Sequence, residues 1–189
     1  MDYTYPAEGV RERLILAGLA ELEEHGFTDF SLRRVASAAQ VSCAAPYRHF
    51  KDKDELILEV IRYVREGWSL LCRNIAEVFA SEPATRVVEL AAAGIRFWLA
   101  NGSFRSVLFG GMSGSDAARR AELALFDKPI SDAVADLAAE GGLTRREGES
   151  LAYTVTALFW GTLVLAASSP SGADTGINKM KEKIKEILK

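Results

Sequence analysis

Basic and aromatic side chains alternate along one short stretch of the chain, and their types suit contact with phosphates and base edges. Although the 189-residue chain has a formal net charge of −3, residues 31–51 contain no acidic residue and four basic ones: Arg33, Arg34, Arg48 and Lys51. Guanidinium and ammonium groups pair with phosphates, and arginine also pairs bidentately with guanine. Between these charges lie three rings: Tyr47, His49 and Phe50. A merely solvated basic face would not need these rings, so the pattern predicts a local nucleic-acid contact surface on an acidic protein.

Two short helices and a turn are predicted to position these side chains. Ser31 can cap a first helix over residues 32–39, because its hydroxyl can accept an N–H group of the first turn. Residues 40–41 form the turn, and Ser42 can cap a second helix over residues 43–49. This order is typical of a helix-turn-helix unit, whose second helix lies in the major groove of DNA.

Four segments of this region resemble the DNA-binding domain of the tetracycline-repressor (TetR) family of bacterial transcription regulators. They are residues 28–32, 35–36, 41–42 and, above all, the run Tyr-Arg-His-Phe-Lys-Asp-Lys-Asp-Glu-Leu at 47–56. Gln40 stands where the family usually has glycine. Phe159-Trp160-Gly161 is similar to the tryptophan-histidine-glycine signature of one subgroup, without its histidine.

The resemblance implies roles for individual side chains. Tyr47 and Lys53 would contact phosphates, Arg48 and His49 would reach phosphates or base edges, and an alanine of the second helix would touch a thymine methyl group. Phe50 is predicted to be core. The predicted DNA-binding residues are Thr28, Ser31, Arg33, Ser42, Cys43, Ala44, Ala45, Tyr47, Arg48, His49 and Lys53.

Composition narrows the class of protein. Hydrophobic residues make up 49% of the chain, enough for a real core. Two cysteines, Cys43 and Cys72, and two histidines are too few and too scattered for a metal cluster, so neither a metal nor a cofactor is expected. The first residues lack the basic and apolar regions of a signal peptide, and we expect a cytoplasmic protein.

The predicted fold is all-α, with about nine helices and no convincing strand. Residues 1–52 form the helix-turn-helix domain, and residues 53–189 form a ligand-binding and dimerisation bundle. Asp52 with Glu55, and Thr144 with Glu147, fit the capping-box pattern that begins a helix. The predicted helices are 7–25, 32–39, 43–49, 53–79, 83–100, 103–109, 115–140, 144–167 and 177–188.

The helix predicted over residues 144–167 is apolar on nearly all sides between Leu151 and Ala167. A membrane span is one interpretation, but the apolar run is shorter than the roughly 20 residues that a span needs and contains three threonines. We expect instead a helix buried on two sides, in its own core and against a second subunit. The chain is therefore predicted to be a homodimer through its last two helices, with recognition helices about 34–36 Å apart for a palindromic operator.

The resemblance also implies a pocket for a small-molecule effector in the C-terminal domain. Few candidate residues are charged, so the effector would be apolar or aromatic, with Arg96 and Arg105 available for an anionic group. Through the helix over residues 53–79, the effector would change the spacing of the recognition helices and release the operator. The predicted ligand-binding residues are Trp68, Leu71, Cys72, Phe97, Trp98, Phe104, Phe109, Met112, Phe126, Tyr153 and Trp160.

Three other functions compete with that of a DNA-binding repressor. Cys43 could act as a redox sensor if the start of a recognition helix lowers the pKa of its thiol. An enzyme is disfavoured, because the sequence has no phosphate-binding glycine loop and no Ser/His/Asp constellation. A protein that kept the helix-turn-helix only to bind partner chains would have no use for phosphate contacts at Tyr47 and Lys53.

Overall fold

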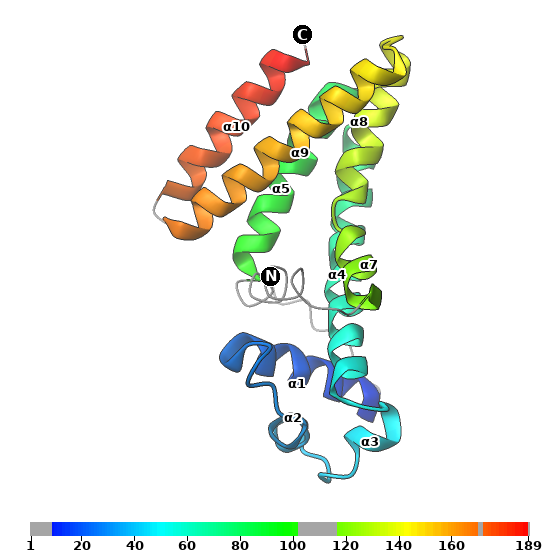
Figure 1. Cartoon of the computed structure of the whole chain (residues 1–189), viewed down its shortest axis with the longest axis vertical. Coiled ribbons are helices and arrows are strands. Elements are labelled where there is room, and N and C mark those ends of the chain that lie inside the picture. Colours follow the sequence, from blue (N-terminus) through cyan, green and yellow to red (C-terminus); the bar gives the residue numbers. More distant parts are fainter. Residues whose placement is uncertain (1–8, 102–116, 170–171, 189) are drawn as a thin grey trace. The chain divides into compact units, whose positions relative to one another are not determined.

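The computed structural model describes residues 9–101, 117–169 and 172–188, and its regular elements in those ranges are all helices (Figure 1). The all-α prediction is confirmed. The described residues form two compact units, one of residues 9–65 and 117–123 and the other of residues 66–101, 124–169 and 172–188. The predicted helix 103–109 lies outside the described residues, and so do the candidate residues Phe104, Arg105, Phe109 and Met112.

The first unit holds α1 (Val10–His25), α2 (Leu32–Ala38), α3 (Pro46–His49), the first half of α4 (Lys53–Val78) and most of α7 (Ala117–Ala124). Its core lies where α1 crosses α4. At the crossing, Gly18 of α1 leaves room for Val60, whose Cγ2 would lie 3.0 Å from a Cβ at that position. Other core residues of this unit are Leu14, Leu22, Val35, Ala36, Leu56 and Ile57.

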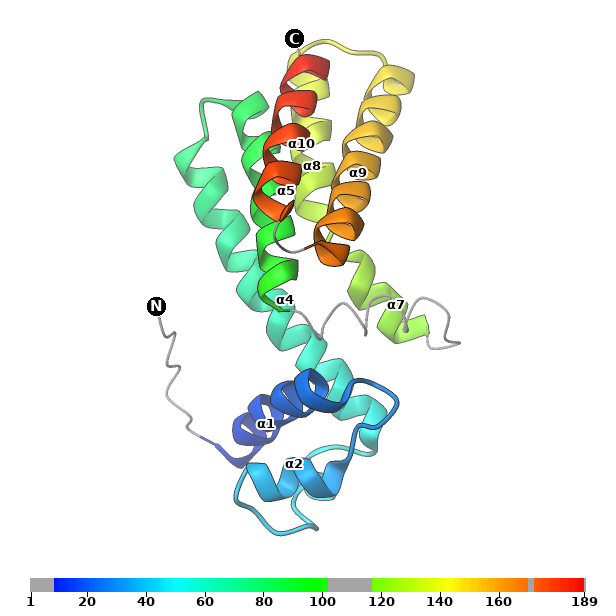
Figure 2. The same cartoon turned by 90° about the vertical axis from the view of Figure 1, so that its left-hand side faces the viewer.

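The second unit is a helical bundle. It combines the second half of α4 with α5 (Pro83–Ala100), α8 (Lys128–Glu140), α9 (Arg145–Ser168) and α10 (Ala173–Ile187). Figure 2 shows α5, α8, α9 and α10 side by side, and α5 contacts the other three. This central position explains why α5 buries so much of its surface: Val87, Val88, Leu90, Ala91, Ala92, Ile95 and Trp98.

Local signals placed several helix ends correctly. Pro83 begins α5, and α5 ends at Ala100, both as predicted. Thr144 and Glu147 form the predicted capping box at the start of α9, where the Thr144 N–H donates to Glu147 Oε2 at 2.8 Å. α10 begins one turn earlier than predicted, at Ala173.

The helix predicted over residues 115–140 is wrong as a single element. The chain forms α7 and α8, which are separated by a turn at residues 125–127. Pro129 explains the break, because it has no N–H group and its ring would clash with the carbonyl of residue 125 in a continuous helix. At the start of α8 the same proline is well tolerated.

Candidate nucleic-acid interface

A buried carboxylate joins the first two helices of the candidate interface. Glu21 of α1 is only 7% exposed. It accepts hydrogen bonds from the Ser31 backbone N–H at 2.9 Å and from Arg34 Nε at 2.8 Å. The hydrogen bond with Glu21 raises the pKa of the Arg34 guanidinium. Arg34, one of the four basic residues of the patch, therefore holds α2 against α1.

The turn after α2 has the geometry that the family resemblance implies. Gln40 has a φ of 55°, in the left-handed region where glycine is the usual residue. The Val41 N–H donates to the carbonyl of Ala36 at 3.0 Å and closes the turn. Ser31 caps α2 as predicted, with its hydroxyl accepting from the Arg34 backbone N–H at 3.4 Å.

The recognition helix is shorter than predicted. α3 begins at Pro46 and not at residue 43, and Ser42 does not cap it with its side chain. The Ala45 N–H instead donates to the Ser42 carbonyl at 2.8 Å, in a turn that precedes the helix. Cys43 is exposed in that turn. It does not begin a helix, so the redox hypothesis loses the helix N-terminus on which it relied.

Most of the predicted contact residues lie on the surface. Tyr47 is 64% exposed, unusual for so large an apolar ring. Ala45 is buried, which leaves Ala44 as the exposed alanine, and Phe50 is core as predicted. The other exposed residues of the set are Thr28, Arg33, Ser42, Cys43, Arg48 and His49, while Ser31 and Lys53 are half-buried.

The start of α4 fixes the position of Lys53. The Glu55 N–H donates to Asp52 Oδ1 at 2.9 Å, and the Lys51 N–H donates to Glu55 Oε2 at 2.5 Å. This cap resembles a capping box in which the glutamate reaches one residue further back. Lys53 Nζ lies 5.5 Å from the centre of the Phe27 ring. The ring and the cap together restrict the ammonium group to one region of the surface.

Residues 14–60 match the family model for bacterial regulatory proteins of the tetR family. The chain carries a TetR-family DNA-binding domain. The matched residues include Glu21, the turn at Gln40, and α3. The match to a family of regulatory proteins covers residues 14–60 and supports a DNA-binding regulator rather than an enzyme.

Solved structures share the whole fold at low sequence identity. A Rhodococcus sp. RHA1 protein described as having unknown function has a TM-score of 0.77 and 23% identity, and the match covers 97% of both chains. A TetR transcriptional regulator from Legionella pneumophila has a TM-score of 0.75 and 18% identity over 100% of both chains. For a TetR transcription regulator from Haloarcula marismortui ATCC 43049 the values are 0.74 and 18%, over 95% of this chain and 96% of that one. No curated protein matches the sequence closely enough to count as a relative.

C-terminal to the TetR-family domain, several predicted ligand-binding residues form one aromatic cluster. The ring centroids of Trp68 and Phe97 are 5.3 Å apart, and Trp98 lies 4.9 Å from Phe126 and 6.4 Å from Trp160. Trp68, Trp98 and Phe126 are almost fully buried, whereas Phe97 and Trp160 are half-buried. Of the predicted ligand-binding residues that the structure describes, Leu71, Cys72 and Tyr153 lie outside this cluster. Tyr153 is 77% exposed on α9, so it lines no interior site of its own unit.

Sequence reasoning missed one charged residue beside this cluster. The Trp160 indole Nε1–H donates to Asp127 Oδ2 at 3.2 Å, while Asp127 Oδ1 is buried and has no hydrogen-bond partner among the described residues. Burial raises the pKa of the Asp127 carboxyl. Asp127 falls inside the single helix predicted over residues 115–140, and nothing in the local sequence pattern indicates that its side chain turns toward a tryptophan.

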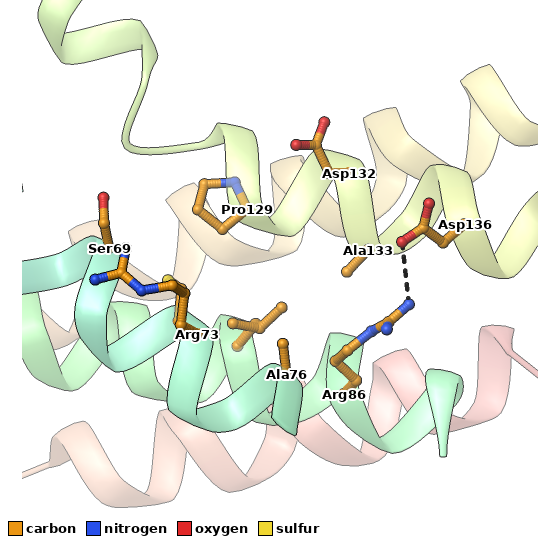
Figure 3. Close-up of a pocket in the computed structure, with 10 residues that line it drawn as sticks. Ser69, Arg73, Ala76, Arg86, Pro129, Asp132, Ala133 and Asp136 are labelled. Atoms are coloured by element: carbon orange, nitrogen blue, oxygen red, sulfur yellow. Dashed lines mark hydrogen bonds and ion pairs between the residues drawn. The ribbon is translucent and has the colours of Figure 1, made fainter. Parts of the chain in front are cut away.

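A separate cavity of about 310 Å³ opens between α4, α5 and α8 (Figure 3). Of the predicted ligand-binding residues it includes only Cys72, and the other lining residues are largely charged or small. Arg86 bonds across the cavity to Asp136 at 3.2 Å. The aromatic residues predicted to line a pocket therefore do not line this one. Among the described residues no group of His, Cys, Asp and Glu could hold a metal ion.

α9 has an apolar face that its own unit does not cover. Val155, Phe159, Leu163 and Ala166 are buried in the bundle, whereas Leu165 is 70% exposed. The other exposed residues on this second face are Tyr153, Ala157, Gly161 and Val164. By length and composition alone, α9 is also the one helix of the described ranges that could cross a membrane.

Proposed function

We propose that the protein is a cytoplasmic homodimeric repressor that binds a palindromic operator through α3 and releases it when a small molecule binds the C-terminal unit. The observation that carries the DNA-binding part is the exposed surface of α3 and its preceding turn within the TetR-family match. Tyr47, Arg48 and His49 are exposed and are not part of the domain core. Pro46 and Phe50 fill the inward positions of the same segment.

Contact with DNA gives these exposed groups a use. The hydroxyl of Tyr47 and the ammonium group of Lys53 suit phosphates, while Arg48 and His49 supply donors for base edges. We retain Thr28, Ser31, Arg33, Ser42, Cys43 and Ala44 as proposed contacts. Arg34 is left out, since Glu21 engages its guanidinium.

Dimerisation gives the second face of α9 a partner. A face with Leu165, Val164 and Ala157 exposed is costly in water at roughly 25 cal/mol per Å² of apolar surface. Gly161 lies on this face, and a Cβ added there would meet nothing within 4 Å of its own chain. The absence of a side chain at that position allows a second helix to approach closely.

The dimer is tested by sedimentation at micromolar concentration. We expect a dimer for the wild type and a monomer for Leu165→Glu, because the substitution places a charge in the proposed interface. Ala139→Glu, which adds the same charge at an exposed position of α8, outside the last two helices, is the control and should sediment as a dimer. A wild-type monomer would refute the proposed architecture.

The effector would bind near the aromatic cluster. α4 contributes residues to both compact units, so a ligand that favours one position of its second half can bias its first half. Linkage then requires reciprocity: operator DNA must weaken effector binding by the same factor by which the effector weakens operator binding.

The operator is found by selecting bound fragments from a randomised DNA library. The proposal predicts a palindrome whose half-sites are centred about one helical turn, or a multiple of it, apart. Enrichment of a single unrepeated half-site would contradict binding of the operator by a dimer. Recovery of no preferred sequence would contradict operator binding itself.

A further inference from the structure

Asp127 occupies the N-cap position of α8 without acting as a cap through its side chain. The Ile130 and Ser131 N–H groups donate to the backbone carbonyl of Asp127, at 3.1 and 3.0 Å. An N-cap aspartate normally accepts such N–H groups with its carboxylate. Here no side-chain capping bond forms, and the carboxylate turns toward Trp160.

One oxygen of this carboxylate lacks a partner among the residues that the structure describes. Oδ2 accepts from the Trp160 indole at 3.2 Å, but Oδ1 is buried and no described group donates a hydrogen bond to it. A buried acceptor left unsatisfied costs about 1–3 kcal/mol, and more when it is charged. A ligand that donates a hydrogen bond to Oδ1 would remove this cost, and a cationic donor would also balance the charge.

The surroundings of the carboxylate are aromatic. Trp98 lies next to both Phe126 and Trp160, and Phe159 packs edge-on against Trp160 with centroids 5.3 Å apart. The faces of such rings attract cations, tryptophan most strongly. Trp160 and Phe97 are only half-buried, so each ring keeps some exposed surface against which a ligand ring can pack.

We propose that the effector is an organic cation with an aromatic ring, whose ammonium group donates to Asp127 Oδ1 while its ring packs against Trp160 and Phe97. The proposal rests on the effector binding proposed above and gives that effector its chemical class. A cationic effector differs from the sequence-based expectation of an anionic group that binds Arg96. The Arg96 side chain is exposed, and its Nη2 lies 3.9 Å from Asp174 Oδ1.

The proposal is tested with three probes that share one ring and differ in charge: 2-naphthylmethylammonium, 2-naphthylmethanol and 2-naphthoate. The chain has three tryptophans, so its indole N–H groups give three resolvable signals in a ¹⁵N-labelled sample. Trp160→Phe assigns the signal of the indole that donates to Asp127. Titration of the full-length protein then gives both an affinity and the place of binding.

We expect the ammonium probe to shift the Trp160 signal and to bind at least about tenfold more tightly than the naphthoate, since a hydrogen bond to a charged group contributes on this scale. Asp127→Asn should abolish this preference. Asp174→Asn, the same change at an exposed position of α10, should leave it intact.

If the wild type bound the three probes with equal affinity, or preferred naphthoate, the proposal would be refuted. This result needs no variant, so it does not depend on whether the variants fold. Binding of the ammonium probe that shifts other signals and leaves Trp160 unmoved would overturn it as well. Operator binding is measured separately, so a failure here with intact operator binding refutes the effector class and not the DNA-binding function.

Discussion

Replacing Glu21 by alanine should loosen the candidate DNA interface, although the residue touches no DNA. The carboxylate is 7% exposed and accepts from the Ser31 N–H and from Arg34. Truncation leaves the half-buried Ser31 N–H without its acceptor, at a cost of about 1–3 kcal/mol. Arg34 is 41% exposed at its side chain and can return to water, so we assign no further cost to it.

A loss of about 2 kcal/mol lowers the melting temperature of a protein of this size by roughly 4–8 °C. The measurement is thermal unfolding of the full chain followed by circular dichroism. Glu24→Ala is the matched control, because Glu24 is exposed on the same helix, and exposed sites of this kind change stability by about 0.5 kcal/mol or less.

We also expect Glu21→Ala to weaken operator binding, since Ser31 begins α2 and its backbone position depends on the lost bond. Equal melting temperatures for Glu21→Ala and Glu24→Ala would refute the reasoning. They would show that the contact between α1 and α2 does not depend on this carboxylate.

Three further predictions concern the thiols, the pH dependence and the glycines. Burial raises the pKa of Cys72 to about 12, so at neutral pH iodoacetamide should modify the exposed Cys43 rapidly and Cys72 only after unfolding; mass spectrometry showing both thiols modified at one rate in the folded protein would contradict this. Burial also raises the pKa of Asp127 above its usual 3.8; the folded state then binds that proton more tightly than the unfolded state, so the stability due to this group is full below pH 3.8 and is lost as the pH rises through the folded pKa. The free energy of unfolding, measured with urea across this pH range, should decline less for Asp127→Asn than for the wild type. The same pH dependence for both proteins would contradict the raised pKa of Asp127. Gly94→Ala should destabilise the fold by about 1–3 kcal/mol, because its Cβ would lie 2.8 Å from Phe159 Cε2. Gly67→Ala, with nothing within 4 Å, should stabilise α4 by about 0.5–1 kcal/mol. Urea unfolding that showed a more stable Gly94→Ala or a less stable Gly67→Ala would contradict the packing described for these two glycines.

Local sequence signals predicted the helix ends that depend on nearby residues. Thr144 and Glu147, or Pro83 at the start of α5, need no distant partner to act. Pro129 marks the break before α8 in the sequence, but the prediction of one helix over residues 115–140 did not use it. The start of α3 was missed because the two alanines before Pro46 favour a helix in isolation, whereas the chain uses them in a turn.

Contacts between distant residues could not be predicted from spacing. Glu21 resembled a solvated helix residue, and its burial depends on Ser31 and Arg34, ten and thirteen positions away. Aromatic residues at helical spacing do not reveal whether they fill a core or line a site. Trp68 and Trp98 fill a core, Tyr153 is exposed, and Asp127, the polar group beside the cluster, was absent from the prediction. The subgroup suggested by Phe159-Trp160-Gly161 stays a prediction, because the family match ends at residue 60.

The central claim is that the surface of α3 and the start of α4 bind operator DNA through phosphates and bases. The most direct test is fluorescence anisotropy with the selected operator over a series of salt concentrations, with excess random DNA present. It compares the wild type with the double variant Tyr47→Phe, Lys53→Ala, and with Lys179→Ala as a charge-matched control on α10. We predict salt-sensitive nanomolar binding for the wild type and the control. The double variant should bind more weakly, with a salt slope shallower by about 2 per dimer, as expected for the loss of one lysine–phosphate contact in each subunit. Equal affinity and equal salt dependence for all three proteins would contradict the proposed interface.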